Sequence, residues 1–278
     1  MATIATEKLG AFVGAEVVGI DVDRLLNDED VPRAVMAALE ENGVLLFREL
    51  HIDDAAQVAF CRRLGEPVRF KGYRIPEIME ISFDPGNPNV EYFRSNDLWH
   101  MDGALDGSAP PKASVMSGHV VTSEGGETEF ASAYAAYDDL SAKEKERFAK
   151  LRVIHTFEAV QRLSYPNPTP EQLAEWNSPS RPPREHPLVW EHRSGRRSLV
   201  FGATTAHVVG MDPEESRALL DDLEHRATTP DRVLRHTWSV GDMVIWDNLG
   251  LVHRACPFDR GTPREMHRST LLGDEPIQ

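Results

Sequence analysis

The sequence predicts a mainly β fold in which a β-rich core is flanked by helices. Strand-like segments dominate the two ends of the chain, and helical patterns recur near its start and in its middle. With 41% hydrophobic and 27% charged residues, the 278 residues can bury one large core. We therefore expect a single domain over residues 1–278.

The first quarter of the chain combines strands with two helices. Residues 10–22 are rich in Val and Gly and predict one or two short strands. Residues 31–42 predict a helix, with a proline near its start and a glycine just beyond its end. Four consecutive apolar residues then mark 43–50 as a buried strand. Asp53 is placed to cap a second helix that runs to Arg63.

The middle of the chain is harder to assign. Residues 76–106 are rich in Pro, Asn, Gly and Asp, and predict a long loop with short extended pieces. Ser141 and Glu144 form a capping-box pattern for a helix to about Leu151. Residues 164–187 hold seven prolines, which argues against regular structure there. Because long loops in compact domains often cover binding sites, we expect a lid-like insertion around residues 158–190.

The C-terminal part returns to strands after one more helix. The run Asp212-Pro213-Glu214-Glu215 predicts a helix start, with leucines 219, 220 and 223 on its apolar face. Strand-like segments follow at residues 233–238, 243–248, 251–255 and 264–272.

Charge and composition exclude several classes of protein. Thirty Lys and Arg against forty-five Asp and Glu give a formal net charge of −15, which disfavours nucleic acid and anionic lipid as partners. Apolar runs fall short of the roughly 18 residues of a membrane-spanning helix, and the N-terminus lacks a secretory pattern. We expect a cytoplasmic protein. Cys61 and Cys256 are too few and too far apart for a disulfide scaffold or zinc ribbon.

His100 and Asp102 form a candidate metal-binding pair. In an extended segment, side chains two positions apart project to the same side, so both can contact one ion. With a second histidine they would complete the two-His, one-carboxylate set that suits non-haem iron(II). The spacing also occurs at His51 and Asp53, where helix capping explains the aspartate. From the spacing alone, an ordinary hydrogen-bonded loop explains His100 and Asp102 equally well.

The C-terminal strands add a histidine and two arginines. His253 lies on one strand-like segment, and Arg264 and Arg268 share one face of the next by period-two alternation. Arginine engages carboxylates through its planar fork, so this combination favours a metal bound together with a carboxylate. Surface arginines on an acidic chain are the alternative explanation.

Five segments in order resemble the taurine dioxygenase family, which includes the 2,4-dichlorophenoxyacetate dioxygenases. They are LWHMDGA, SEGGETEFASAYAAYDDL, SGRRSLVFGATTAHVVGM, VGDMVIWDNLGLVHRA and REMHRSTLLGD. The resemblance runs from about residue 10 to the C-terminus. It implies a double-stranded β-helix (jelly-roll, cupin-like) core and an iron(II)- and 2-oxoglutarate-dependent dioxygenase that hydroxylates a small molecule with O2 and releases succinate and CO2.

The resemblance also implies roles for individual residues. His100, Asp102 and His253 would be the iron ligands. Arg264 and Thr128 would hold the distal carboxylate of 2-oxoglutarate, which agrees with the hydroxyl and guanidinium donors that these residues supply.

Substrate contacts follow less directly. Arg268 would reach the anionic group of the substrate or the inner carboxylate of 2-oxoglutarate. Tyr73, Asn96 and Gly103 are expected beside the substrate, and Phe70 stands where the taurine enzyme has a histidine. Losing that charge-assisted contact would cost a sulfonate roughly 1.5–3 kcal/mol, so taurine is disfavoured. We expect an aryl or alkyl carboxylate, a sulfonate or a sulfate ester.

A few further residues are candidates with two explanations each. His207 lies near the pocket or is a surface or core histidine. Trp246 and Asp247 support His253, or are a buried Trp and a turn-side Asp. The positions expected to supply aromatic walls of the substrate pocket fall near Gln161 and Thr204–Thr205, which are not aromatic. The other histidines, His119 and His267 among them, are expected to be structural.

Alternative functions remain open on the sequence alone. The same scaffold could desaturate or cyclise its substrate, whereas a halogenase typically lacks the carboxylate that Asp102 supplies. A non-catalytic jelly-roll binding protein has no reason to keep the full set of ligands and arginines. A zinc hydrolase gains nothing from an arginine and a threonine placed for a diacid. A homodimer or homotetramer is expected from the family.

Overall fold

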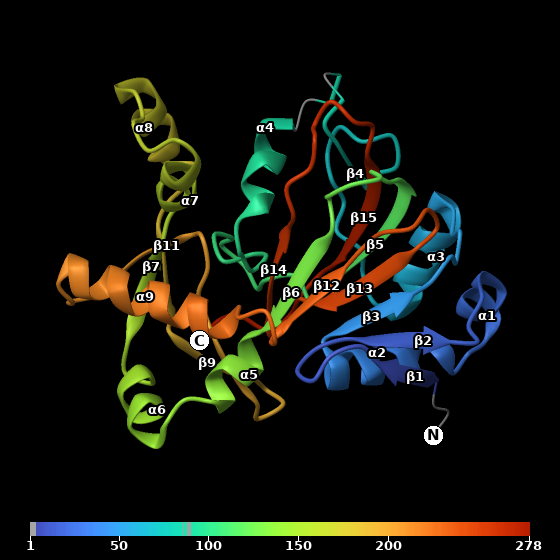
Figure 1. Ribbon diagram of the computed structural model, residues 1–278, viewed down its shortest axis with the longest axis horizontal. Coiled ribbons are helices and arrows are strands. Elements are labelled where there is room, and N and C mark those ends of the chain that lie inside the picture. The colour runs from blue at the N-terminus through green and yellow to red at the C-terminus, as the bar shows by residue number, and fades with distance from the viewer. Residues whose placement is uncertain (1–3, 85, 88–89) are drawn as a thin grey trace.

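The structure is a computed structural model that describes residues 4–84, 86–87 and 90–278 (Figure 1). Its largest sheet has seven strands in the order β1-β2-β3-β13-β5-β15-β4. The bounds are Ala5–Lys8 (β1), Ala15–Val18 (β2), Val44–Phe47 (β3), Met243–Asp247 (β13), Ala113–Val120 (β5), Glu265–Leu271 (β15) and Met79–Ser82 (β4). Neighbouring strands are antiparallel except β2 and β3, which are parallel.

A second sheet has three antiparallel strands in the order β12-β6-β14: Val233–His236, Thr128–Ser132 and Leu251–Ala255. Another three-stranded sheet has the order β11-β7-β8 (Thr205–Val208, Arg152–His155, Arg184–Pro187), and a two-stranded sheet pairs β10 with β9 (Arg197–Leu199, Val189–Glu191).

The helices are α1 (Val22–Asn27), α2 (Val31–Asn42), α3 (Asp54–Leu64), α4 (Val90–Phe93), α5 (Ala133–Asp138), α6 (Ala142–Phe148), α7 (Phe157–Ser164), α8 (Pro170–Trp176) and α9 (Pro213–Ala227), with a 3-10 turn η1 (Arg94–Asp97). Helices α7 and α8 project from the end of the molecule that holds β7 and β11, at the upper left of Figure 1. Among the described residues, no helix is both long and apolar enough to cross a membrane.

The central strands of the seven-stranded sheet are buried on both faces, as strand β3 illustrates. Val44 and Leu46 point into a core shared with Phe130 of strand β6, in the β12-β6-β14 sheet. Leu45 and Phe47 point to the opposite face, into a core covered by α1, α2 and α3. Alternate side chains of a strand face opposite sides of its sheet, so a strand buried on both sides needs a continuous apolar run. This is the origin of the Val-Leu-Leu-Phe sequence.

Most of the elements expected from the sequence are confirmed. The helix over 31–42 and the strand that follows it match α2 and β3. Asp53 caps α3 by accepting a hydrogen bond from the Ala56 amide at 2.8 Å. The capping box at Ser141 and Glu144 is present, although α6 ends at Phe148. The four C-terminal strand segments correspond to β12, β13, β14 and β15.

Two predictions about the middle of the chain were wrong. Residues 164–187 contain helix α8 and strand β8 despite their prolines. Pro170 begins α8, where its missing N–H costs nothing, and Pro187 ends β8, an edge strand. The irregular segment 76–106 holds β4 as an extended piece but also α4 and η1, which the sequence did not predict. Cys61 and Cys256 are both buried and free.

Candidate metal centre

The backbone brings His100 and His253 side by side. His253 lies on β14, and His100 lies in an extended segment that pairs with it through an isolated antiparallel bridge. The His100 amide donates to the His253 carbonyl at 3.1 Å, and the His253 amide donates to the His100 carbonyl at 2.9 Å. The two imidazole rings have centroids 4.3 Å apart. Residues 153 positions apart are thereby fixed as neighbours.

A hydrogen bond to the backbone sets the tautomer of His100. Its Nδ1 lies 2.7 Å from the carbonyl oxygen of Leu98, which can only accept, so Nδ1 carries the proton. The lone pair is then on Nε2, the atom nearest to Asp102. Metal-binding histidines are commonly oriented by such a contact from the other ring nitrogen.

Asp102 completes the cluster. Its Oδ1 is 4.0 Å from His100 Nε2 and its Oδ2 is 4.0 Å from His253 Nε2. The three ligand atoms lie within 4.8 Å of one another. Donor atoms about 2.1 Å from one ion lie roughly 3–4 Å apart, so movements on the order of 1 Å would let all three contact it. The two histidines and the carboxylate match the set expected for iron(II).

The electrostatics keep these groups in the state that binds a cation. Burial would raise the pKa of Asp102, but Arg268, His253 and His100 lower it to about 2. Burial, reinforced by His100, lowers the pKa of His253 well below its ordinary value. At neutral pH the site therefore offers a carboxylate and a neutral imidazole.

The segment that carries His100 is held by a close backbone approach at Gly202. The Ala203 amide donates to the Trp99 carbonyl at 2.8 Å. Gly202 has φ +127°, and a Cβ there would lie 2.9 Å from the Trp99 oxygen and 3.2 Å from His100 Cα. Only glycine satisfies both conditions. Gly202 is not among the residues predicted for the site, although a glycine inside a strand-like stretch is a signal of such a close approach.

Arg268 extends the site on the side of β15. Its Nη2 donates to Asp102 Oδ2 and, at 2.9 Å, to Ser114 Oγ. The guanidinium carbon of Arg268 lies 5.2 Å from the centroid of the Trp246 ring. The centroid of the same ring lies 5.0 Å from the centroid of the His253 ring. The expected support of His253 by Trp246 is therefore present. Asp247 is buried and accepts from the Leu249 amide at 2.9 Å, which fits the turn-side alternative.

Arg264 is a buried cation that contacts no carboxylate of the described residues. The residue is 8% exposed, and its Nη2 donates to the Gly126 carbonyl at 3.1 Å. Burial lowers the pKa of Arg264 to about 10, although Asp97 opposes the shift. Among the described residues, no carboxylate oxygen lies within 4 Å of its guanidinium nitrogens. Such a group is costly to bury unless an anion joins it.

Thr128 and Arg268 also have hydrogen-bond donors for which the described residues offer no acceptor. The Thr128 hydroxyl accepts from Trp238 Nε1 at 3.0 Å, and since an indole N–H can only donate, the hydroxyl hydrogen is left to donate elsewhere. Arg268 Nε is buried and has no partner among the described residues. Together with Arg264, these donors fit a bound diacid.

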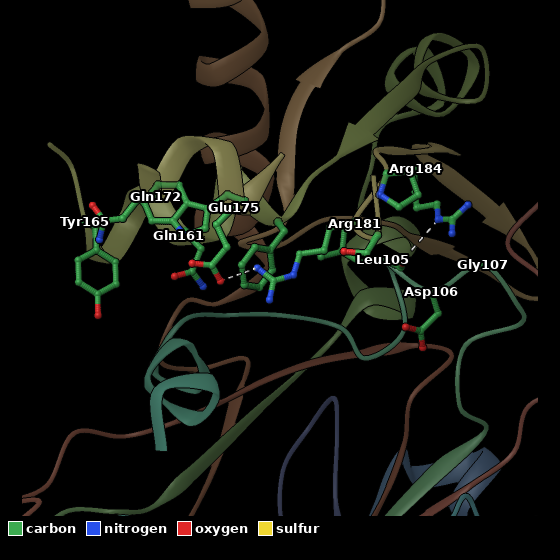
Figure 2. Close-up of a pocket in the computed structure, with 13 residues that line it drawn as sticks. Leu105, Asp106, Gly107, Gln161, Tyr165, Gln172, Glu175, Arg181 and Arg184 are labelled. Carbon is green, nitrogen blue, oxygen red and sulfur yellow. Dashed lines mark hydrogen bonds and ion pairs between the residues drawn. The ribbon is translucent and has the colours of Figure 1, made fainter. Parts of the chain in front are cut away.

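A cavity of about 140 Å³ opens beside the metal cluster. It is lined by His100, Asp102 and Arg268, and by the apolar side chains of β4 and α7. This inner cavity adjoins a larger, outer cavity of about 740 Å³ (Figure 2). Both cavities are lined by Leu105, Asp106 and Phe157. In the outer cavity Arg181 Nη1 lies 3.4 Å from Glu175 Oε1, and the Arg181 guanidinium carbon stacks 4.1 Å from the centroid of the Phe157 ring. The two cavities could hold a substrate longer than a few atoms.

Comparison with known proteins agrees with this geometry. The family model for the taurine catabolism dioxygenase TauD, TfdA family matches residues 5–270. The chain belongs to this family.

Individual relatives match over nearly the full chain. An alpha-ketoglutarate-dependent 2,4-dichlorophenoxyacetate dioxygenase from Burkholderia sp. (strain RASC) is 33% identical over 279 residues, covering 94% of this chain and 92% of that protein. An alpha-ketoglutarate-dependent sulfate ester dioxygenase from Pseudomonas putida is 32% identical, covering 95% and 88%. The crystal structure of AAD-2 in complex with Mn(II) and N-oxalylglycine superimposes with a TM-score of 0.83 at 30% identity, over 100% of both chains.

Membership confirms the predicted fold and reaction class. The core is a jelly roll, in which the seven-stranded sheet and the β12-β6-β14 sheet are two separate layers. The protein is a 2-oxoglutarate-dependent dioxygenase that uses iron(II) and O2. The structure also supplies a cluster of the right chemistry for the iron, and unused donors for the cosubstrate.

The substrate residues expected for this dioxygenase are only partly gathered. Asn96, Gly103 and Arg268 line the inner cavity. Phe70 and Tyr73 lie in the segment between α3 and β4 and pack edge to face at 6.2 Å. They are not among the residues that line either cavity.

The remaining candidates are distributed as follows. Gln161 lines the outer cavity and Thr204 the inner one, whereas Thr205 is buried and donates to the Gly202 carbonyl at 2.7 Å. His207 is exposed on β11 and lines neither cavity. Phe157 of α7 lines both cavities and is not among the residues predicted from the sequence, although Thr156 is a recognisable N-cap before an amphipathic run.

Proposed function

We propose that His100, Asp102 and His253 bind the catalytic iron(II) of this dioxygenase. The observation that carries the proposal is their convergence, with the His100 Nε2 lone pair and the Asp102 carboxylate directed at one point. Three ligands on one face of the ion leave adjacent positions for a bidentate cosubstrate and O2. The bound iron, with 2-oxoglutarate and O2, supplies the oxidising chemistry, and 2-oxoglutarate is converted to succinate and CO2.

Arg264 and Thr128 would bind the distal carboxylate of 2-oxoglutarate. The buried Arg264 guanidinium has no carboxylate partner in the described part of the chain, and the Thr128 hydroxyl has a hydrogen to donate. A carboxylate between them would satisfy both groups and offset the cost of burying the cation. Arg268 would use its free Nε for the inner carboxylate of 2-oxoglutarate or for the anionic group of the substrate.

The substrate is proposed to be an aryl or alkyl carboxylate, a sulfonate or a sulfate ester, with the first class preferred. Met79, Ile81 and Phe93 give the inner cavity an apolar wall suited to a ring or alkyl chain. Arg181 in the outer cavity adds a cation that could attract an anion. Relatives named for 2,4-dichlorophenoxyacetate and for sulfate esters support this choice.

Residues 158–190 are proposed to act as a lid within a single domain over 1–278. The segment includes most of α7, all of α8 and strand β8, and it lines much of the outer cavity (Figure 2). Loops and short helices that close over a site exclude water and orient the substrate. Tyr73 and Phe70 would contact the substrate only if their own segment also closes over the cavities, and their role in substrate binding stays a prediction.

The proposal is tested by mixing the protein with iron(II) and 2-oxoglutarate without oxygen, and then admitting oxygen with single substrates. The panel holds phenoxyacetates, alkyl sulfates, alkyl sulfonates and taurine. We expect an absorption band on mixing and succinate release that depends on a phenoxyacetate or alkyl sulfate, and His253→Ala should abolish both. Iron binding without any effect of 2-oxoglutarate would contradict the assignment.

The product distinguishes hydroxylation from its alternative on the same scaffold. Mass spectrometry should show the gain of one oxygen atom, whereas desaturation or cyclisation removes two hydrogen atoms. A homodimer or homotetramer and a cytoplasmic location stay predictions, which light scattering and cell fractionation would check.

A further inference from the structure

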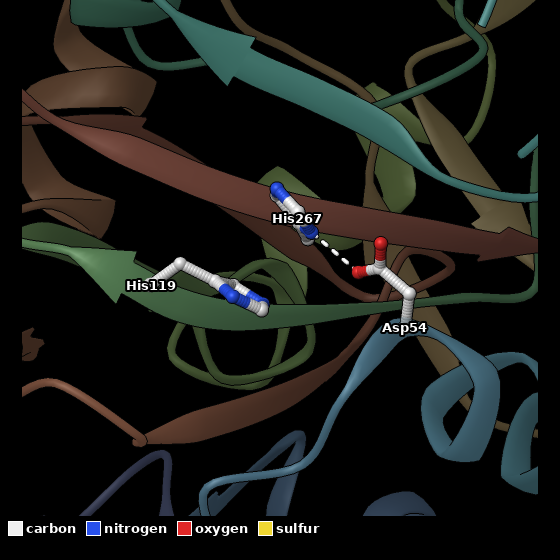
Figure 3. Close-up of side chains that lie close together, drawn as sticks. All are labelled: Asp54, His119 and His267. Carbon is white, nitrogen blue, oxygen red and sulfur yellow. Dashed lines mark hydrogen bonds and ion pairs between the residues drawn. The ribbon is translucent and has the colours of Figure 1, made fainter. Parts of the chain in front are cut away.

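A second cluster of metal-ligating side chains lies on the outer face of the seven-stranded sheet. It consists of Asp54 at the start of α3, His119 on β5 and His267 on β15 (Figure 3). Because side chains alternate along a strand, His267 lies on the face of β15 opposite Arg268. The cluster is therefore separate from the proposed iron site. The iron site's function does not explain it.

The three groups are close enough to share one ion. One ligand atom from each lies within 4.8 Å of the other two. His267 Nδ1 is 2.5 Å from Asp54 Oδ1, and the two imidazole rings have centroids 3.9 Å apart with planes at 27°. The side chains of Asp54 and His267 are 14% and 7% exposed, so the site is sheltered. His119 is partly exposed, which gives an ion a route of entry.

Hydrogen bonds fix the proton on His119. The Gln57 Nε2 group donates to the His267 carbonyl at 3.1 Å, so the amide oxygen of Gln57 is the atom that faces Ser117. The Ser117 hydroxyl donates to that oxygen at 2.7 Å. Ser117 Oγ must then accept from His119 Nε2 at 3.0 Å. The lone pair of His119 is therefore on Nδ1 and is free to bind a cation.

His267 is oriented in a comparable way. Its Nε2 lies 2.8 Å from Glu265 Oε1, and a carboxylate can only accept, so Nε2 is protonated. The Nδ1 atom faces the Asp54 carboxylate. A carboxylate that accepts from the outer nitrogen of a histidine, while the inner nitrogen faces a cation, is a recurrent support of metal ligands.

We propose that Asp54, His119 and His267 form a second metal site that binds Zn²⁺ or a similar transition-metal ion through two Nδ1 atoms and a carboxylate oxygen. Two imidazoles and one carboxylate favour Zn²⁺, Co²⁺, Ni²⁺ or Cu²⁺ over Ca²⁺ and Mg²⁺, which prefer oxygen ligands. His119 and His267, structural histidines on the sequence alone, would be ligands of this ion.

Binding requires a small rearrangement that the site permits. An imidazole binds a metal in its ring plane, so the stacked rings must open for their lone pairs to meet one ion. His119 can tilt because it is partly exposed. The ion would replace the proton shared by His267 Nδ1 and Asp54 Oδ1, which is released to solvent. It would tie the start of α3 to β5 and β15, the strand that also carries Arg268 on its other face.

The test counts ions in a protein whose iron site is disabled. In the His100→Ala/His253→Ala background, we expect titration calorimetry with Zn²⁺ to give one bound ion and Tm to rise with Zn²⁺ concentration. Adding His119→Ala or Asp54→Asn should weaken the remaining site by at least tenfold and remove the Tm rise. His225→Ala, an exposed histidine on α9, serves as the matched control and should change neither.

Co²⁺ gives a second readout, because its visible absorption reports nitrogen ligands. The background protein should develop this absorption with one equivalent of Co²⁺, and His119→Gln should not. Circular dichroism without metal checks that each variant is folded. The proposal is overturned if the background binds no Zn²⁺, or if folded His119→Ala, His119→Gln and Asp54→Asn proteins all bind it as the background does.

Discussion

Substituting Arg264 tests the proposed cosubstrate site most directly. Arg264→Met keeps a long side chain but removes the guanidinium that would hold the distal carboxylate of 2-oxoglutarate. The residue is 8% exposed, so the lost contact is a buried charge pair. Removing one partner of such a pair costs about 2–5 kcal/mol. The dissociation constant for 2-oxoglutarate should therefore rise by roughly 30-fold to several thousand-fold.

The assay compares two cosubstrates under anaerobic conditions. 2-Oxoglutarate and pyruvate share the keto acid that chelates iron, but pyruvate lacks the distal carboxylate. Each is titrated into the iron(II)-loaded protein and followed by absorbance. Arg264→Met should weaken the binding of 2-oxoglutarate strongly and the binding of pyruvate by no more than a few fold. The reason is that the mutation and the absence of the distal carboxylate in pyruvate remove the same contact. Arg235→Met, an exposed arginine that pairs with Glu127, is the control.

Two results would refute this reasoning. Unchanged affinity for 2-oxoglutarate would mean that the guanidinium does not reach the distal carboxylate. Equal weakening of both cosubstrates would mean that Arg264 acts by supporting the fold around Gly126 rather than by binding the diacid.

Three further predictions follow from the site and its surroundings. Asp102→Ala removes one of three metal ligands and should weaken iron(II) binding by more than roughly 100-fold in anaerobic titration, and an affinity within tenfold of the original would contradict the ligand set. Gly202→Ala forces a Cβ within 2.9 Å of the Trp99 oxygen, so urea denaturation should show a loss of about 1–3 kcal/mol together with weaker metal binding. Burial raises the pKa of Asp247 to about 6, above its ordinary 3.8, so the folded protein keeps a proton that the unfolded chain releases. The free energy of unfolding should fall by about 3 kcal/mol as the pH rises from about 4 to about 7, and Asp247→Asn should remove that part of the decline.

Local patterns predicted the elements whose signals lie within a few residues. Asp53 and the Ser141 capping box were correctly assigned because a cap is a contact over three residues. Strand β3 was correctly assigned because its two buried faces require a continuous apolar run. The same reasoning was wrong at 164–187, where counting prolines ignored that Pro170 and Pro187 occupy positions that tolerate them.

The candidate site was predictable in its residues and unpredictable in its arrangement. His100, Asp102 and His253 were identified from a spacing and from a family resemblance. That His100 pairs with His253 through its backbone, and that Gly202 holds the segment in place, depends on contacts between distant residues. Phe70 and Tyr73 were expected beside the substrate, and their segment packs on itself instead of lining the described cavities.

The sequence by itself determined the jelly-roll family and the reaction class, and it indicated the chemical types of the candidate metal ligands, because these follow from ordered motifs and from side-chain chemistry. Tertiary structure alone decided which nitrogen of His100 and of His119 is free, which donors of Thr128 and Arg268 lack partners among the described residues, and that Asp54 lies beside His119 and His267. The physical reason is that proton positions and buried charge depend on neighbours brought together by folding, and no local pattern in the chain records which neighbours those are.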